Sequence, residues 1–248
     1  MNKKFLIFGG VVAALVLAAY IGLEYFLGRA VKAGVNAFGP KITRTKVELA
    51  GAMISPLSGS GTLTGLTVGN PAGWTAEKAF YFGKVHVKLK PFSIFGDFIE
   101  IEEIIIEQPE FTYETKIIAS NIGDLLKNIE AVTGRADKST EPTATSGKPI
   151  KFAVKKLSIR SGTVSVGLSA AAIKVPLPPV ELTGLGTAEG GITPDQLTVA
   201  VMRRLTPDII AAAAKAALQL GGTGGAAAAE SVKKAGSAIK NLFGGDKK

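Results

Sequence analysis

The sequence predicts an α+β fold that is mainly β: an N-terminal transmembrane helix, then an elongated, twisted, mostly antiparallel β-sheet or groove with a few short amphipathic helices. Three observations predict it: an uncharged apolar run near the N-terminus, alternation of apolar and polar residues from residue 46 onward, and helical spacing in short later segments. The expected boundaries are 1–4 for a short N-terminal segment, 5–27 for the anchor, 28–134 for a first β region, 135–149 for a linker, 150–192 for a second β region, 193–220 for a helical segment and 221–248 for a tail.

The apolar run is long enough to cross a membrane. Residues 5–23, FLIFGGVVAALVLAAYIGL, carry no charge, and a helix of this length spans about 28 Å, close to the hydrocarbon thickness of a bilayer. The rival interpretation is a cleaved signal peptide, which would have a shorter apolar region and a small-x-small cleavage site. Because the run continues to Phe26 without such a site, we expect an uncleaved anchor at residues 5–27 that contacts the lipid bilayer.

The orientation of this anchor is not decided by charge. Lys3 and Lys4 precede the run, and Arg29 and Lys32 follow it, so the positive charges nearly balance. A first-segment anchor normally delivers the chain that follows it across the membrane. We therefore expect a single-pass protein with a cytoplasmic N-terminus and the bulk of the chain outside the cytoplasm.

The composition excludes several classes of function. The 248-residue chain has no cysteine and one histidine, which excludes disulfides and thiol nucleophiles and argues against a His-based metal site. The net charge of +9 is spread over strands and chain ends, so it lacks the concentrated basic footprint that nucleic acid requires. No nucleophile elbow, phosphate loop or metal-ligand spacing is present. The sequence predicts no enzyme, catalytic residue, metal site or cofactor, and no nucleic-acid partner.

Two strand-like segments of the first β region define an apolar face. In residues 80–90, one side of the strand carries Tyr81, Val85, Val87 and Leu89, and the other side carries lysines and His86. In residues 98–114 the doubled Glu102–Glu103 shifts the alternation, so the later isoleucines rejoin the apolar side if a bulge lies there. The predicted face, which is either a lipid-binding surface or core, consists of Val85, Val87, Leu89, Ile99, Ile101, Ile104 and Ile106.

The opposite face is interpreted as solvated. His86 lies in the lysine row, and glutamates alternate with isoleucine along the next strand. Lysines and glutamates on neighbouring antiparallel strands pair across the sheet with about 0.2–1 kcal/mol each. We therefore expect cross-strand ion pairs here, and neither a metal ligand at His86 nor a hydrolase carboxylate pair.

Helical spacing appears in two further places. Residues 120–133 place Ile122, Leu125, Leu126 and Ile129 on one side, with Ser120 or Asn121 as the N-terminal cap. After the Ser/Thr/Pro-rich linker, strands resume, and Arg160–Thr163 is interpreted as a hairpin turn. In residues 193–220, Thr193 with Gln196 and then Thr206 with Pro207 predict the starts of two successive helices.

One turn motif stands out within GLTVGNPAGW at residues 65–74. Gly69, Asn70, Pro71 and Gly73 are turn residues because Pro fixes φ, while Gly and Asn accept positive φ. The motif contains no acid, base or metal ligand, so the sequence predicts a structural role for it.

The ordered set of motifs resembles the AsmA-like family of bacterial envelope proteins. The matching segments are the anchor, SPLSGSGTLTGLTVGNPAGW, AFYFGKVHVKLKPFSIFGDFIEIEEIIIEQPEFTYE, SNIGDLLKNIEAVTG, VKKLSIRSGTVSV and VPLPPVELTGLG, which together cover roughly residues 1–220. The resemblance implies a twisted sheet related to the TamB and chorein-type bridge-like lipid-transfer proteins. It also implies an apolar groove for acyl chains and a role in phospholipid transport or outer-membrane assembly. The resemblance further implies that the anchor lies in a bacterial inner membrane and that the bulk of the chain lies in the periplasm. This chain is far shorter than the large members of the family.

Two functions follow from these expectations. The first is a membrane-anchored, non-enzymatic protein that binds phospholipid acyl chains on the apolar face. The second is an envelope scaffold with a closed core, which binds other envelope proteins at its surface. Apolar faces alone do not separate the two, because a core and a lipid groove use the same residues.

The tail also has two interpretations. Val232, Ile239, Leu242 and Phe243 recur at helical spacing, with lysines off that stripe. A basic amphipathic helix of this kind can lie on an anionic membrane surface. The alternative is a disordered solubilising tail, which Gly236 and the small number of large apolar residues favour.

Overall fold

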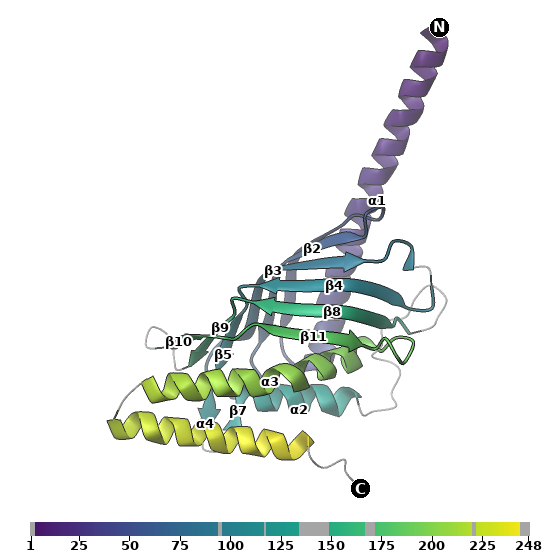
Figure 1. Cartoon of the computed structure of the whole chain (residues 1–248). Helices are drawn as coiled ribbons and strands as arrows, with labels where there is room; N and C mark the ends of the chain where they lie inside the picture. The colour runs from purple at the N-terminus through teal and green to yellow at the C-terminus, as the bar shows by residue number, and fades with distance from the viewer. Residues whose placement is uncertain are drawn as a thin grey trace.

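The computed structural model describes residues 3–93, 96–116, 118–133, 149–166, 172–219 and 222–243. The predicted linker at 135–149 therefore lies outside the described residues except for Pro149. The fold is α+β, as expected, although helix (45%) exceeds strand (35%). A nine-stranded mixed sheet is combined with four helices in the described parts of the chain (Figure 1).

The elements follow one another along the chain with the following bounds. The helices are α1 (Lys3–Thr43), α2 (Asn121–Thr133), α3 (Pro194–Gln219) and α4 (Gly222–Phe243). The strands of the large sheet are β1 (Val47–Ile54), β2 (Ser60–Gly69), β3 (Lys78–Leu89), β4 (Ile99–Glu107), β5 (Glu110–Tyr113), β8 (Phe152–Arg160), β9 (Thr163–Val166), β10 (Ile173–Pro176) and β11 (Val180–Leu185). A small separate hairpin consists of β6 (Thr115–Lys116) and β7 (Ala119–Ser120).

The sheet is mostly antiparallel but has a parallel centre. β1, β2, β3 and β4 pair antiparallel in chain order. β8 then lies parallel to β4, and β9 lies parallel to β5, because α2 and the linker separate these strands in the sequence. β11 and β10 close the far side by pairing antiparallel with β8 and β9.

A kink line crosses the sheet and divides it into two halves. The long half contains β4, β8, β11 and the end of β3 near Leu89, and the short half contains β5, β9, β10 and the start of β3. Gln108 and Ser161 lie on this line with φ of 50° and 53°, and Gly65 in β2 has φ of 62°. In β3, which runs through both halves, Phe80 and Val85 are both buried despite their odd spacing, so the inward side of the strand changes phase between them. Tyr81, which the sequence predicted on the apolar side with Val85, pairs with the exposed Glu110 and is not part of the core.

The kink line corrects one prediction. Arg160–Thr163 was expected to form a hairpin turn, but β8 and β9 pair with other strands and not with each other. The chain bends at Ser161 and continues in the neighbouring half of the sheet. Residues that accept positive φ occur in kinks as well as in hairpin turns, because both use the left-handed backbone region.

The hydrophobic core lies between the apolar face of the sheet and the helices. All four predicted apolar positions of α2 (Ile122, Leu125, Leu126 and Ile129) are buried, and Ser120 caps this helix by accepting a hydrogen bond from the Gly123 N–H (3.1 Å). α3 contacts β5, β9, β10 and β11, and it also packs on α2 and α4. Much of the short half is therefore closed by the protein's own helices.

α3 is a single helix, whereas the sequence predicted two. Its start agrees with the prediction: Pro194 is the first residue, and the Gln196 side chain accepts a hydrogen bond from the Thr193 N–H (3.0 Å). Pro207 lies inside the helix, where it removes one backbone donor. Thr206 donates its hydroxyl to the Met202 carbonyl (2.7 Å), and both residues are buried in the core. The helix therefore continues through Pro207 because its buried side packs in the core, although Thr206 and Pro207 are locally typical of a helix start.

α1 extends well beyond the predicted anchor. Its first part projects from the body of the protein, and its second part runs along β1 (Figure 1). The glycines explain how close this contact is: a Cβ on Gly28 would lie 2.2 Å from the Ala52 carbonyl oxygen, and one on Gly39 would lie 2.7 Å from Val47. Asn36 accepts a hydrogen bond from the Leu49 N–H (2.7 Å), so α1 also covers the outer edge of the sheet.

Candidate functional site

The predicted apolar face exists as one surface of the sheet. Val85 pairs with Ile106, Val87 pairs with Ile104, and Leu89 pairs with Ile101, so all six lie in register on the same side. The pairing shifts between Lys88 and Leu89, opposite Glu102. The bulge that the sequence predicted at Glu102–Glu103 is therefore present, and it returns Ile104 and Ile106 to the apolar side.

Burial varies within this face. Val85, Ile101 and Ile106 are buried, with 6–8% of their surface exposed. Val87, Leu89, Ile99 and Ile104 are only partly buried and pack against the rim of the core. β3 and β4, which carry these residues, lie between β1, which α1 contacts, and β11, which α3 contacts. The face is thus closed at the sides by helices and more open over its middle strands.

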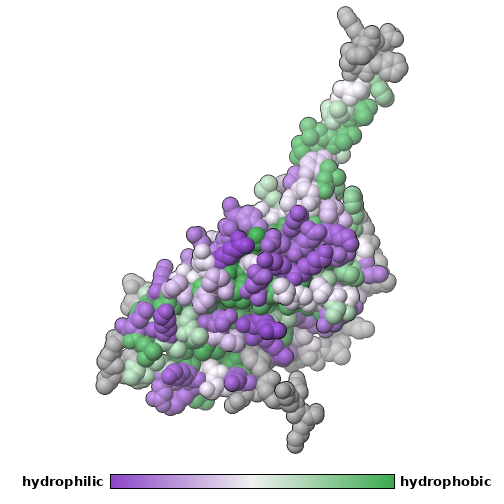
Figure 2. All heavy atoms as spheres, in the orientation of Figure 1, coloured by the Kyte–Doolittle hydropathy of each residue, from purple (hydrophilic) through white to green (hydrophobic). Residues whose placement is uncertain are grey.

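The outer face is polar, as predicted. Figure 2 shows hydrophilic atoms gathered over the side of the long strands that faces the viewer. Lys90 pairs with Glu100 (2.7 Å), Lys88 lies 3.8 Å from Glu102, and Lys156 pairs with Glu181 (3.1 Å). The His86 Nδ1 lies 3.5 Å from the Thr62 hydroxyl. Within the described ranges, no group of three or more His, Cys, Asp or Glu residues is placed to hold a metal ion.

The turn motif at Gly69–Gly73 belongs to a buried polar network. Glu114 accepts hydrogen bonds from the Thr75 N–H (2.9 Å), the Ala76 N–H (2.7 Å) and the Asn70 side chain (3.1 Å). Asn121, the first residue of α2, donates to Asn70 Oδ1 (2.8 Å) and accepts from the Glu114 N–H (2.9 Å). This network joins the turn, the end of β5 and the start of α2, and it satisfies a carboxylate that is only 9% exposed.

Trp74 and its neighbours also link the turn motif to the start of α2. The Trp74 indole donates to Asp124 in the first turn of α2 (3.1 Å), and the Lys116 ammonium lies 4.6 Å from the centre of the Trp74 ring. Gly73 has φ of 88° and its carbonyl accepts a hydrogen bond from Lys116 (2.7 Å). The motif therefore has the structural role that the sequence predicted. The roles of Glu114 and Asn121 were not predicted, because their partners are distant in sequence.

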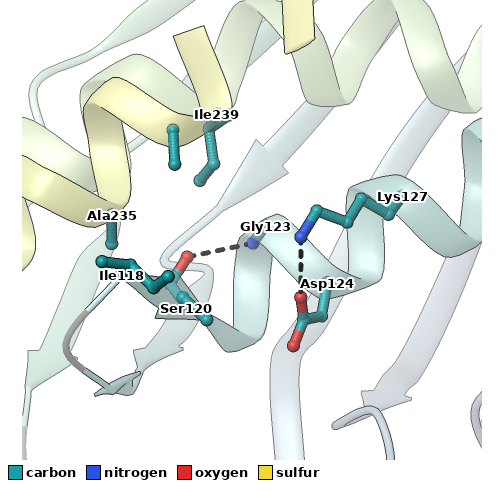
Figure 3. A pocket seen from close by; sticks show the side chains of 9 residues that line it. Ile118, Ser120, Gly123, Asp124, Lys127, Ala235 and Ile239 are labelled. Carbon is teal, nitrogen blue, oxygen red and sulfur yellow. Dashed lines mark hydrogen bonds and ion pairs between the residues drawn. The ribbon is translucent and has the colours of Figure 1, made fainter. Parts of the chain in front are cut away.

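A small hollow lies beside this network. It has a volume of about 230 Å³ and is lined by Ile118, Ser120, Asp124, Lys127 and Ile239 among others (Figure 3). This is smaller than the pockets of about 300–1,000 Å³ that usually hold small molecules. The polar groups in it already have partners: Ser120 caps α2, and Asp124 binds Trp74 and Lys127. The hollow offers no free group for chemistry.

One titratable group in the core is perturbed. Tyr113 at the end of β5 is fully buried, and burial raises the pKa of its phenol. The Tyr113 hydroxyl has no hydrogen-bond partner of good geometry among the described residues, so the nearby Ser120 and Thr115 side chains lower this pKa by less than burial raises it. Because the neutral phenol is the ordinary form below pH 10, this shift keeps Tyr113 uncharged and gives it no acid–base role at neutral pH.

The tail prediction requires a correction. α4 places Val232 and Ile239 in the interior, with 0% and 4% of their surface exposed, and α4 packs along α3. Val232 and Ile239 are thus covered by the protein itself and are neither spread on a membrane surface nor part of a disordered tail. The side chains of Leu242 and Phe243 lie outside the described residues. Helical spacing identified the buried side but not its partner.

The predicted anchor is helical throughout its described length. The helix contains a stretch that is long and apolar enough to cross a membrane, and the side chains of this stretch are not buried in the protein. Apolar residues such as Phe8, Leu15 and Val16 are 64–69% exposed, and Figure 2 shows hydrophobic atoms on the projecting part of α1. Tyr20, near the end of this stretch, contacts the body of the protein through its hydroxyl, which lies 2.8 Å from the Ser55 hydroxyl.

Comparison with known proteins identified no relative of this chain. No family model matches the chain, and neither a curated protein nor a solved structure matches it. The resemblance to AsmA-like proteins therefore rests on the order of the sequence motifs alone.

Proposed function

We propose that this protein is a membrane-anchored, non-enzymatic module of the AsmA-like kind that binds phospholipid acyl chains on the apolar face of its sheet. The observation that carries the proposal is the uneven burial of this face. Val87, Leu89 and Ile104 stay partly exposed on the middle strands, although their neighbours on both sides are covered. Exposed aliphatic side chains in register on a rigid sheet are a suitable surface for an acyl chain.

The helix α1 supports the location of this function. Its exposed apolar side chains need a nonpolar solvent, because large contiguous apolar surfaces are rare on soluble proteins. A helix that anchors the chain in a bilayer also keeps the sheet next to a supply of phospholipid. We place the N-terminus in the cytoplasm and the sheet in the periplasm of a bacterial envelope, and phospholipid transport or outer-membrane assembly is the process that this arrangement would serve.

Photo-crosslinking in cells tests lipid binding. A photoreactive amino acid at Val87 or Ile104 should capture phospholipid, because these side chains lie on the more open part of the apolar face. The matched controls are Lys88, whose side chain points outward and is 61% exposed, and Phe111, which is fully buried. Lipid adducts at Val87 and Ile104 alone would support the proposal. Folded protein without adducts at either position would exclude it.

Protease accessibility tests the location. In cells whose outer membrane has been removed, protease should degrade the chain after Arg29 while leaving the first residues with the inner membrane. A mature N-terminus near residue 28 would exclude the anchor, and protection of the sheet would exclude the periplasmic location.

A closed envelope scaffold is the second candidate, and it is favoured by the full burial of Val85, Ile101 and Ile106. These residues are already covered in the absence of any ligand, as core residues are. In this case partners would bind at the polar outer surface, and the crosslinks at Val87 and Ile104 would capture protein or nothing. The same experiment therefore separates the two candidates.

A further inference from the structure

We infer that one end of the sheet inserts into the membrane leaflet beside α1, through a rim formed by Met53, Leu57 and Phe92. This inference rests on the proposed membrane anchoring by α1. It adds a second membrane-binding surface, located on the folded body of the protein, that the sequence motifs did not indicate.

The depth of the rim follows from one contact. The Tyr20 hydroxyl lies 2.8 Å from the Ser55 hydroxyl in the turn between β1 and β2. Tyr20 belongs to the uncharged run of residues 5–23, three residues before its end. At 1.5 Å per residue this is about 5 Å inside the end of the run. Helix side chains also point back toward the N-terminus, so the hydroxyl lies deeper than its own Cα.

The apolar run is no longer than the hydrocarbon core of a bilayer is thick. Residues 5–23 span about 28 Å, and the hydrocarbon core of a bilayer is about 30 Å thick. If the run crosses the bilayer, Tyr20 lies within the leaflet or at its boundary. The turn that contacts Tyr20 must then lie at the same depth, because the helix and β1 are in direct contact at Gly28 and Ala52.

Three large apolar residues at this depth are uncovered, beside the exposed Ser58 and Ser60 of the same turn. Met53 and Leu57, on either side of Ser55, are 67% and 68% exposed. The loop after β3 lies against the same turn, since the Leu89 N–H donates to the Gly59 carbonyl (2.7 Å) and Pro91 approaches Gly59. Phe92 in that loop is 67% exposed. In Figure 1 the turn between β1 and β2 lies at the end of the sheet from which α1 projects.

Charge does not explain this surface. Lys88 and Lys90 near the rim are engaged with Glu102 and Glu100, so apolar insertion and not attraction to anionic headgroups is the expected mode of binding. Tyr25 and Phe26 on α1 are each 65% exposed, and aromatic residues of this kind are enriched at membrane interfaces. The rim and these aromatics together would fix the body of the protein against the leaflet.

The absence of cysteine makes the test direct, because a single introduced cysteine labels one position. The full chain would be reconstituted into vesicles of phosphatidylethanolamine and phosphatidylglycerol, with the environment-sensitive fluorophore NBD at Leu57→Cys or Phe92→Cys. Ile118→Cys is the matched control, because Ile118 is an equally exposed apolar residue (70%) in the β6–β7 hairpin. Leu15→Cys reports whether α1 itself is inserted.

We expect the probes at Leu57 and Phe92 to shift to shorter wavelength and to be quenched several-fold more by nitroxide-labelled lipid than the probe at Ile118. The Ile118 probe should remain accessible to iodide. If the Leu15 probe lies in lipid while the probes at Leu57 and Phe92 are as accessible to iodide as Ile118, the rim is excluded and the anchor stands. If the Leu15 probe is also accessible to iodide, both the anchor and the rim are excluded. An unchanged thermal transition of each variant shows that labelling has not unfolded it.

Discussion

The two halves of the sheet carry the same apolar face but are covered differently. In the short half, Phe80, Phe111, Val164 and Val175 form one row across four strands and are 0–5% exposed. In the long half, the row that contains Val87 and Ile104 is only partly buried on these two strands. Both halves show the same alternation in the sequence. The comparison teaches that alternation indicates the apolar side of a strand within each half, while the helices decide how far that side is closed.

The largest expected effect is in the short half. Phe111→Ala should lower the free energy of unfolding by about 3–5 kcal/mol, because it leaves a cavity in a closed core where Phe80 and Phe82 pack on the lost ring. Val87→Ala in the long half should cost only about 1 kcal/mol, since its side chain is partly buried. Chemical unfolding in mild detergent measures both. Equal losses would show that the two halves are equally closed.

The polar network of the short half should be the next most sensitive site. Glu114→Ala removes the buried carboxylate that accepts from the Thr75 and Ala76 N–H groups, and we expect a loss of about 3 kcal/mol because each hydrogen bond to a charged group contributes about 1.5–3 kcal/mol. Glu110→Ala, at the exposed start of β5, the strand that Glu114 directly follows, is the control and should be nearly neutral. A lower melting temperature for Glu110→Ala than for Glu114→Ala would contradict the structural role of the network.

The close contact between α1 and β1 predicts a smaller effect. Gly28→Ala places a Cβ against a backbone oxygen that cannot easily move, so a loss of about 1–3 kcal/mol is expected, as for other overpacked sites. Gly22→Ala is the matched control, since no atom lies within 4 Å of the added carbon. Thermal unfolding of the two variants compares a position of α1 that is packed on β1 with a nearby position that has open space beside it. No difference between them would mean that α1 is not held against β1.

The short half should also show an effect of alkaline pH, through Tyr113. Because burial raises the pKa of Tyr113 in the folded state, folding favours the neutral phenol. This contribution to stability is fully present below the unfolded pKa of about 10 and is lost as the pH rises through the higher folded value. Wild-type protein should therefore lose more stability than Tyr113→Phe above pH 10. Parallel alkaline unfolding curves for the two proteins would show that Tyr113 ionises freely in the folded state.

The smallest effect is expected on the outer face of the long half. Lys90→Ala breaks the ion pair with Glu100, but the lysine side chain is 55% exposed, so the loss should be about 0–1 kcal/mol and should disappear at high salt. Unfolding at low and high ionic strength measures this. A loss as large as that of Glu114→Ala would mean that the outer face is not solvated.

The sequence by itself determined the features that depend on local pattern. The alternation around Val85–Leu89, the bulge at Glu102, the buried side of α2 and the cap at Thr193 all follow from residues close to one another in the chain. These predictions are confirmed because side-chain direction and capping are set within a few residues by backbone geometry.

The tertiary structure alone decided what each pattern packs against. Ser161 has the backbone of a turn but forms a kink, because β8 finds its partners in β4 and β11. Thr206 and Pro207 resemble a helix start but continue α3, and Val232 and Ile239 pack into the core. Each of these outcomes depends on a partner far away in the sequence. An apolar stripe gains the same transfer free energy from a helix, a strand or a bilayer, so the stripe cannot specify which of them covers it.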